Sequence, residues 1–410
     1  MTANDRYPLR AGVAKVDITP PNLTGFTNLW RTPFSGVHDP IFLRTLVVDN
    51  GVNRAAMVAA DLLEFGDTMP LRARIEDELG IPAGHIIITA SHAHNTPRAG
   101  SVTKGASASV GPPATAAYTE VLYDRIVESV QQAIAALRPA RVGIGKGRAD
   151  VNTNRDEFAS KGWLLGVNPQ GPSDKTVWVV KFESTEGKPI AILMNYAVHA
   201  VVLGPENTQI TGDLPGVAER YVEDYFDNEV VALWTIGAAG DQNPKYMGWD
   251  TTFTQKDREL GYPLMEALGR VVGEEVVSVA ERIDRMTDQV RIAAEERVVS
   301  CPAQTPRRRL GPAPEQGVDS LNLRLGLILI NHIAITSVSG EVSTNIYYHL
   351  REDSPFTNTL MVTMGNDRAG YIVEDAAYET PTFEVSGTPF APGHAESAIV
   401  DGLVEMMSKY

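Results

Sequence analysis

The order of apolar and polar residues divides the chain into short apolar runs and longer stretches of helical periodicity. Residues 45–49 and 55–61 are apolar runs joined by the turn sequence Asn-Gly-Val-Asn, which is typical of neighbouring strands. An apolar stripe at helical spacing predicts a helix over 69–80, with Pro70 in its first turn and Gly80 at its end. Further strands are expected at 85–90, 189–200, 230–237, 332–340 and 359–366, and further helices at 118–137, 213–227, 256–282 and 342–351.

Strands that alternate with helices predict an α/β fold. No change in composition marks a second domain, so we expect residues 1–410 to form a single large domain. In this domain we expect a mixed β-sheet, flanking helices and an active site in loops at strand ends. The Pro- and Arg-rich segment 301–317 has no periodicity, and we expect a long surface loop that could serve as a lid.

The composition excludes several classes of partner. The formal net charge of −15 leaves no excess of Lys and Arg to neutralise the phosphates of a nucleic acid. Cys301 is the one cysteine, which excludes an intramolecular disulfide and a Cys-based zinc site. No apolar run reaches the roughly 18 residues of a membrane span, and the N-terminus shows no signal pattern. We therefore expect a cytoplasmic protein without stable membrane insertion; the sequence leaves the oligomeric state open.

Histidines and a carboxylate follow several predicted strands. Two of the 8 histidines, His92 and His94, stand two apart in the segment SHAHN, where an extended backbone would point both side chains the same way. His199 ends another apolar run, and Glu341 follows a strand and a glycine. Each also has an ordinary structural explanation, such as a hydrogen-bonded core histidine or a first-turn glutamate favoured by the helix dipole.

Three further loops carry polar candidates. Arg155 in NTNRDEF could hold an anion or a carboxylate, and Asn243 lies in the Gly-rich turn GAAGDQNP. Tyr371 and Tyr378 lie in GNDRAGYIVEDAAYE, although a single tyrosine is most often structural. The sequence contains no Gly-x-Ser-x-Gly elbow, no P-loop and no His-Glu-x-x-His motif. Cys301 has no obvious partner, which argues against a thiol mechanism.

Taken in order, these segments resemble the neutral/alkaline (non-lysosomal) ceramidase family, zinc amidases that hydrolyse an N-acyl bond. Each motif alone is weak, but their order, from about residue 11 to about residue 390, is specific for the superfamily. The matching segments are AGVAKVDITPP, GVHDPIFLRTLVV, MVAADLL, ITASHAHNTPRAG, NTNRDEF, NYAVHAVVLGPENTQITGDLPG, GAAGDQNP and SGEVST.

The resemblance implies a zinc site built from two histidines, a glutamate and a tyrosine. On this chain the four ligands fall on His92, His199, Glu341 and Tyr371. The resemblance also implies that His94 and Arg155 face the substrate. A bound Zn²⁺ can bring the pKa of its water to about 7. His94 could then shuttle a proton, and Arg155 or His94 could stabilise the oxyanion.

The chain departs from the family pattern near the expected substrate. Asn243 stands where the family has a serine often assigned as a nucleophile, and an asparagine cannot fill that role. Phe383 stands where the family has a substrate-facing tyrosine. We expect Asn243 to act by hydrogen bonding in catalysis, and Tyr378 and Phe383 to contact the substrate. Because the chain ends at Tyr410, we expect a compact relative without the family's C-terminal immunoglobulin-like domain.

The leading interpretation is a zinc-dependent hydrolase that cleaves an amide (N-acyl) or related acyl bond of a small molecule with a metal-activated water. An esterase, a lactonase or a lyase could use the same cage, since activated water attacks esters and a metal can hold an enolate. A third interpretation is a non-catalytic metal-binding protein with a decayed site. Retention of the four ligand positions beside His94 and Arg155 argues against that third interpretation.

Overall fold

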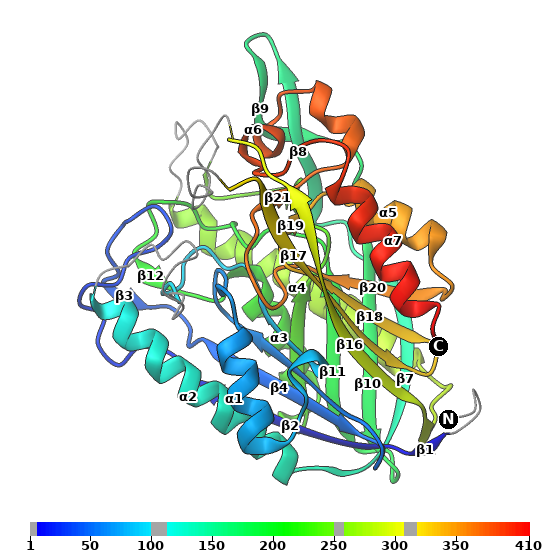
Figure 1. Ribbon diagram of the computed structural model, residues 1–410. Helices are drawn as coiled ribbons and strands as arrows, with labels where there is room; N and C mark the ends of the chain where they lie inside the picture. Colours follow the sequence, from blue (N-terminus) through cyan, green and yellow to red (C-terminus); the bar gives the residue numbers. More distant parts are fainter. Residues whose placement is uncertain (1–5, 100–112, 250–257, 307–317) are drawn as a thin grey trace.

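Two β-sheets form the centre of the computed structural model, which describes residues 6–99, 113–249, 258–306 and 318–410. The larger sheet has eight strands and is mixed. Its pairs β5–β6 and β11–β13 are parallel, and its other neighbours are antiparallel. The smaller sheet has four strands, of which β18 and β20 run parallel. Figure 1 shows the smaller sheet, yellow to orange, crossing in front of the larger one.

The strands of the larger sheet are, in spatial order, β13 (Val231–Ile236), β11 (Pro189–Tyr196), β10 (Thr176–Ser184), β7 (Arg138–Arg148), β2 (Arg10–Asp17), β4 (Phe42–Asp49), β5 (Arg54–Ala60) and β6 (Ile86–Ala90). Those of the smaller sheet are β16 (Ile292–Pro302), β17 (Ser320–Ile330), β18 (Ile333–Val338) and β20 (Asn358–Val362). A three-stranded sheet contains β14 (Gln242–Pro244), β8 (Asn152–Ala159) and β9 (Gly162–Asn168). Three short pairs are β1 (Tyr7–Pro8) with β15 (Gln289–Val290), β3 (Gly36–Val37) with β12 (Gln209–Ile210), and β19 (Glu341–Val342) with β21 (Tyr371–Ile372).

Helices cover the outer faces of both main sheets. The helices are α1 (Met69–Leu79), α2 (Pro113–Ala135), α3 (Asp213–Tyr225), α4 (Arg258–Arg282), α5 (Thr344–Asp353), α6 (Phe383–Gly387) and α7 (Ala395–Met407). Two short 3₁₀ turns span Ala83–His85 and Asp375–Glu379. One apolar core lies under α1 and α2, a second under α3 and α4, and a third under α5 and α7. A fourth core, including Trp178 and Ile335, fills the space between the two sheets, so the layers run helix, sheet, sheet, helix.

The structure confirms every strand and helix that the periodicity predicts, with small shifts at the ends. The predicted strand 189–200, for example, ends at Tyr196, so that His199 lies in the loop beyond it. Helix α1 has Pro70 in its first turn and Gly80 in the left-handed conformation at its C-terminus, as expected. The α/β prediction with a mixed sheet is therefore confirmed.

Two expectations about segment 301–317 have different outcomes. Its first two residues, Cys301 and Pro302, end the long strand β16, and Cys301 is buried, so the predicted loop begins too early. The remaining prediction, a surface excursion that could act as a lid, falls mainly on residues 307–317, which lie outside the described residues. Within the described part of the chain, no helix is long and apolar enough to cross a membrane.

A buried ion cluster fastens α3 to the larger sheet. The guanidinium of Arg44 on β4 lies 2.9 Å from the Asp61 carboxylate and 2.7 Å from that of Glu219 on α3. It also donates to Glu223, one helical turn further on, at 3.1 Å. Burial raises the pKa of Glu219 well above its ordinary value. Lys15 pairs with Glu223 at 2.6 Å, so two cations and three acids meet in this cluster.

Replacing Arg44 by methionine should lower the free energy of unfolding by about 3–5 kcal/mol, because the substitution leaves buried acids without their cation. Urea denaturation measures the change. The matched control is Arg74→Met, which removes an exposed arginine paired with Glu78 and Asp124 and should cost about 0–1 kcal/mol. Equal effects of the two substitutions would show that the cluster does not stabilise the fold.

Candidate metal centre

Three histidines from two loops meet beside the ends of β6 and β11. The candidate ligand atoms of His92, His94 and His199 all lie within 4.8 Å of one another. A single bridge between Ala93 and Ala200 holds the two loops side by side. The expectation of an extended backbone at His92 is wrong, since its φ is 63°, in the left-handed region. The rings of His92 and His94 are nevertheless neighbours, with centroids 4.9 Å apart.

Backbone carbonyls fix the orientation of two of the rings. Nδ1 of His92 donates to the carbonyl oxygen of Leu63 at 2.9 Å. Nδ1 of His199 lies 2.8 Å from the carbonyl oxygen of Ala239 and 3.0 Å from that of Gln242. A proton held on Nδ1 leaves Nε2 with a free lone pair, which is the arrangement seen in metal-binding histidines. Both Nε2 atoms can therefore act as ligands.

The two free Nε2 atoms point at one carboxylate oxygen. Oε2 of Glu341 lies 3.3 Å from Nε2 of His92 and 3.1 Å from Nε2 of His199. Burial alone would raise the pKa of Glu341, but the neighbouring imidazoles of His92 and His199 hold it well below its ordinary value. Burial lowers the pKa of His199 to about 3, whereas Glu341 outweighs burial at His92 and raises the pKa of that imidazole. The carboxylate of Glu341 therefore favours its ionised form between the two imidazoles.

Tyr371 completes a set of donors of the kind that a divalent metal ion takes. The parallel pair β19–β21 places Glu341 and Tyr371 directly opposite each other. Tyr371 is buried, and burial together with the Glu341 charge raises the pKa of its hydroxyl well above the ordinary value. Two imidazole nitrogens, a carboxylate and a phenol oxygen suit a metal ion that accepts mixed nitrogen and oxygen ligands. The residues present therefore fit a bound metal.

His94 stands beside this donor set with its ring free for another role. Among the described residues neither ring nitrogen of His94 has a hydrogen-bond partner, although both are buried. Burial, followed by the nearby His92 and His199, lowers the pKa of His94 well below its ordinary value. The ring of Trp30 lies 5.4 Å from His94 and 5.5 Å from the ring of Trp249, centroid to centroid. No sequence pattern marks either tryptophan, because neither follows a predicted strand.

Arg155 is held in one position by three side chains. Its Nε donates to Glu384 at 2.6 Å, Nη1 to Asn243 at 3.1 Å and Nη2 to the hydroxyl of Tyr371 at 3.1 Å. The rings of Tyr371 and Phe383 each lie 5.5 Å from its Cζ. Pairing of β8 with β14 brings the Arg155 and Asn243 segments together. Arg155 is therefore a buried, fixed positive charge at the edge of the donor set.

The structure brings together eight of the nine residues singled out in the sequence. They are His92, His94, Arg155, His199, Asn243, Glu341, Tyr371 and Phe383. Tyr378 is directed elsewhere, since its hydroxyl donates to the backbone oxygen of Phe390 at 2.9 Å, which gives no support to its predicted contact with a substrate. Glu384, which no pattern marked, is the main carboxylate partner of Arg155.

Comparisons with known proteins give a consistent family likeness. The family model described as neutral/alkaline non-lysosomal ceramidase, N-terminal, matches residues 9–260. The neutral ceramidase of Drosophila pseudoobscura pseudoobscura is 25% identical over 58% of this chain and 36% of that protein. Neutral ceramidase 1 of Arabidopsis thaliana is 22% identical over 72% of this chain and 39% of that protein. This chain therefore spans well under half the length of these curated relatives.

Solved structures share the fold. The neutral ceramidase of Pseudomonas aeruginosa superposes with a TM-score of 0.79 at 16% identity, covering 99% of this chain and 75% of that one. A ceramidase complexed with C2 gives a TM-score of 0.80 at 17% identity, covering 98% and 76%. At such low identity the likeness shows a common architecture, which agrees with the predicted α/β class.

The geometry predicts which histidines retain a metal. His92→Ala and His199→Ala should each lower the bound metal to well below one ion per chain, because each removes an oriented Nε2 ligand. His94→Ala should keep the metal. Elemental analysis of dialysed, folded protein measures the content. An alternative site made of the three histidines alone predicts equal losses in all three variants, and that result would refute the ligand set with Glu341 and Tyr371.

Proposed function

This chain belongs to the neutral/alkaline non-lysosomal ceramidase family, and from that premise we propose that it is a zinc-dependent hydrolase cleaving an amide (N-acyl) or related acyl bond of a small molecule. One observation carries the proposal. Two oriented imidazoles and a carboxylate converge in a buried site, next to a third imidazole without a partner among the described residues. A cytoplasmic location and a single-domain organisation stay predictions from the sequence.

Zinc is the proposed ion because the donor set is of the type that catalytic zinc sites use. His92, His199, Glu341 and Tyr371 would hold it. When bound, Zn²⁺ supplies Lewis acidity to an acyl carbonyl and lowers the pKa of water toward about 7. The carbonyl partners of the two Nδ1 atoms fix both imidazoles in the tautomer that binding needs.

His94 is the proposed proton carrier. Hydrolysis places a water oxygen on the acyl carbon, breaks the C–N bond and requires a proton on the departing nitrogen. A group within hydrogen-bond reach of both water and nitrogen can move that proton. Both ring nitrogens of His94 are unpartnered within the described part of the chain, and its ring adjoins those of His92 and His199. The ring nitrogens of His94 can therefore hydrogen-bond to a substrate, because no described residue engages them.

Arg155 supplies a fixed charge to the same site. Preorganised positive charge stabilises the negative charge that develops on an acyl oxygen, with no reorganisation during the reaction. Three hydrogen bonds hold the Arg155 guanidinium in one position before the reaction, and one of them is accepted by Asn243. Asn243 therefore acts here as a positioning residue for the guanidinium. Trp30 and Trp249 present aromatic surface next to His94, which suits an apolar part of the substrate.

His94→Ala and Arg155→Ala should retain zinc and lose on the order of 10²- to 10⁴-fold in turnover. The assay is a panel of N-acyl amines of increasing acyl length, with matched esters and lactones, run with and without chelator. The control His349→Ala removes a half-exposed histidine that pairs with Glu396 and should leave turnover unchanged. Normal turnover in both site variants would refute the assigned roles. Hydrolysis of the esters but not of the amides would show that the cleaved bond is an ester bond.

No covalent acyl-enzyme should form during hydrolysis, because Asn243 occupies the position where the family has a serine. Rapid-quench mass spectrometry of the intact protein, sampled within the first turnover, should show no added acyl mass. The first turnover should also show no burst of released amine. An acyl group mapped to any side chain of this protein would overturn the direct attack by water.

A further inference from the structure

A short buried loop, residues 199–203, ties three parts of the candidate site together. Its first residue is the proposed metal ligand His199. The carbonyl oxygen of its second residue accepts the backbone N–H of His94 at 3.2 Å, and that of its third accepts the indole N–H of Trp249 at 2.9 Å. The path of this loop therefore sets the positions of a metal ligand, the proposed proton carrier and the aromatic surface beside it.

Asp213 holds the far end of this loop with both oxygens of its carboxylate. Oδ1 accepts the backbone N–H of Val202 at 3.2 Å, and Oδ2 accepts that of Leu203 at 3.1 Å. Oδ1 also accepts the N–H of Leu214 at 2.7 Å, which fastens the loop to α3. Without the carboxylate, two buried N–H groups of the loop would lose their acceptor. That state is costly, so the loop would take another path.

The fold keeps Asp213 in an unfavourable position. Its exposed fraction is 0%, so the three N–H groups and the N-terminus of α3 must stabilise its charge. Its φ is 53°, a left-handed conformation that residues other than glycine seldom adopt. Burial raises the pKa of Asp213 to about 6 against the lowering effect of the three N–H groups, so the carboxyl group is ionised at neutral pH. Strain of this kind persists only where the surrounding structure imposes it.

We propose that Asp213 is a positioning residue for the metal centre, because its carboxylate fixes the path of the 199–203 loop and thereby the direction of His199. The proposal rests on the function proposed above, since it needs a metal at His199. The alternative is an ordinary helix cap, which would stabilise α3 and leave the site unchanged. Gly212 occupies the cap position, however, and two of the three N–H donors to Asp213 lie in the loop rather than in the helix.

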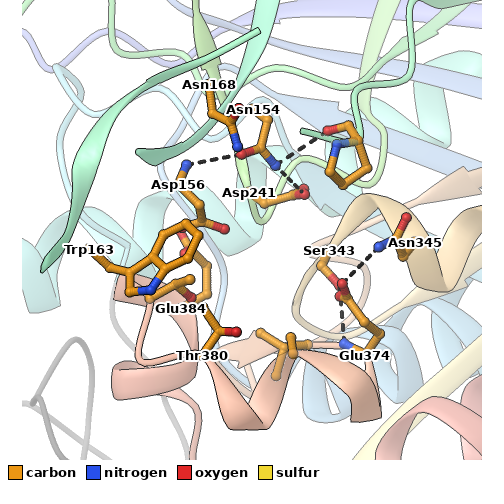
Figure 2. Close-up of a pocket in the computed structure, with 14 residues that line it drawn as sticks. Asn154, Asp156, Trp163, Asn168, Asp241, Ser343, Asn345, Glu374, Thr380 and Glu384 are labelled. Carbon is orange, nitrogen blue, oxygen red and sulfur yellow. Dashed lines mark hydrogen bonds between the residues drawn. The ribbon is translucent and has the colours of Figure 1, made fainter. Parts of the chain in front are cut away.

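A separate turn holds the other side of the His199 imidazole. Nδ1 of His199 lies against two carbonyl oxygens of the turn 239–242. Asp241 in that turn accepts a hydrogen bond from Asn154 (Figure 2). Loss of the Asp213 carboxylate should therefore leave the imidazole near the site but let its Nε2 shift. Metal binding would then weaken without being abolished.

The zinc affinity of the full chain tests the proposal, measured by competition with a chromogenic chelator on variants shown to be folded by circular dichroism. Asp213→Gly suits the left-handed backbone and removes the carboxylate, so zinc affinity should fall by about tenfold or more. Asp213→Asn keeps one acceptor oxygen and should lie between Asp213→Gly and the wild type. With Co²⁺ in place of zinc, the visible absorption spectrum of Asp213→Gly should change, because the ligand geometry changes.

Asp49→Asn is the matched control. Asp49 is also buried, and its carboxylate accepts the backbone N–H of Gly51 at 2.6 Å. It pairs with Arg54 at the start of β5, whereas the site lies beyond the end of that strand. Asp49→Asn should lower the free energy of unfolding in urea and leave both the zinc affinity and the Co²⁺ spectrum unchanged.

Three results would overturn the role of Asp213. The first is wild-type zinc affinity in Asp213→Gly. The second is a loss of affinity with an unchanged Co²⁺ spectrum, which would show a structural role alone. The third is an equal loss of affinity in Asp49→Asn, which would show that zinc binding follows general stability. A wild-type chain that binds no zinc would instead refute the proposed function, and the role of Asp213 with it.

Discussion

The site depends on burying the carboxylate of Glu341 without leaving its charge alone. A buried, unpaired carboxylate is strongly unfavourable, so the surrounding groups must supply opposite charge and donors. His92 and His199 face this carboxylate, with their Nε2 atoms 3.3 Å and 3.1 Å from its Oε2. His94 stands beside them with both ring nitrogens buried and, in the described structure, unpartnered. A divalent cation held by these donors would supply the positive charge that the carboxylate needs.

The fold meets this requirement through very short pairings between loops, placed at the ends of long strands. Glu341 and Tyr371 are opposite each other in a two-residue parallel pair, and Ala93 bridges to Ala200 between the two histidine loops. Each pairing fixes a register with few hydrogen bonds, because the two main sheets and their helices already hold the loop ends in place. Side chains far apart in sequence thus converge without a long insertion.

The sequence predicts the strands and helices whose apolar pattern is strong. It misses strands in which small residues replace that pattern because a helix packs closely against them. Strand β7 consists largely of glycine and charged residues. Gly145 and Gly147 lie against α4. A Cβ at Gly145 would come within 2.7 Å of Val279, and one at Gly147 within 2.0 Å of Glu275. The site residues were identified from the order of motifs, not from geometry, and the left-handed backbone at His92 has no signature in the pattern. Glu384 was missed because its role depends on Arg155, 229 positions away.

Arg155 is the fixed positive charge at the edge of the metal centre. Its Nη2 donates to Tyr371, and its Nε donates to Glu384. Burial opposes its charge, but Tyr371 and Glu384 outweigh burial and raise its pKa, so the guanidinium stays protonated. A lysine could not replace it, since one ammonium on a flexible stem cannot hold three partners in fixed directions.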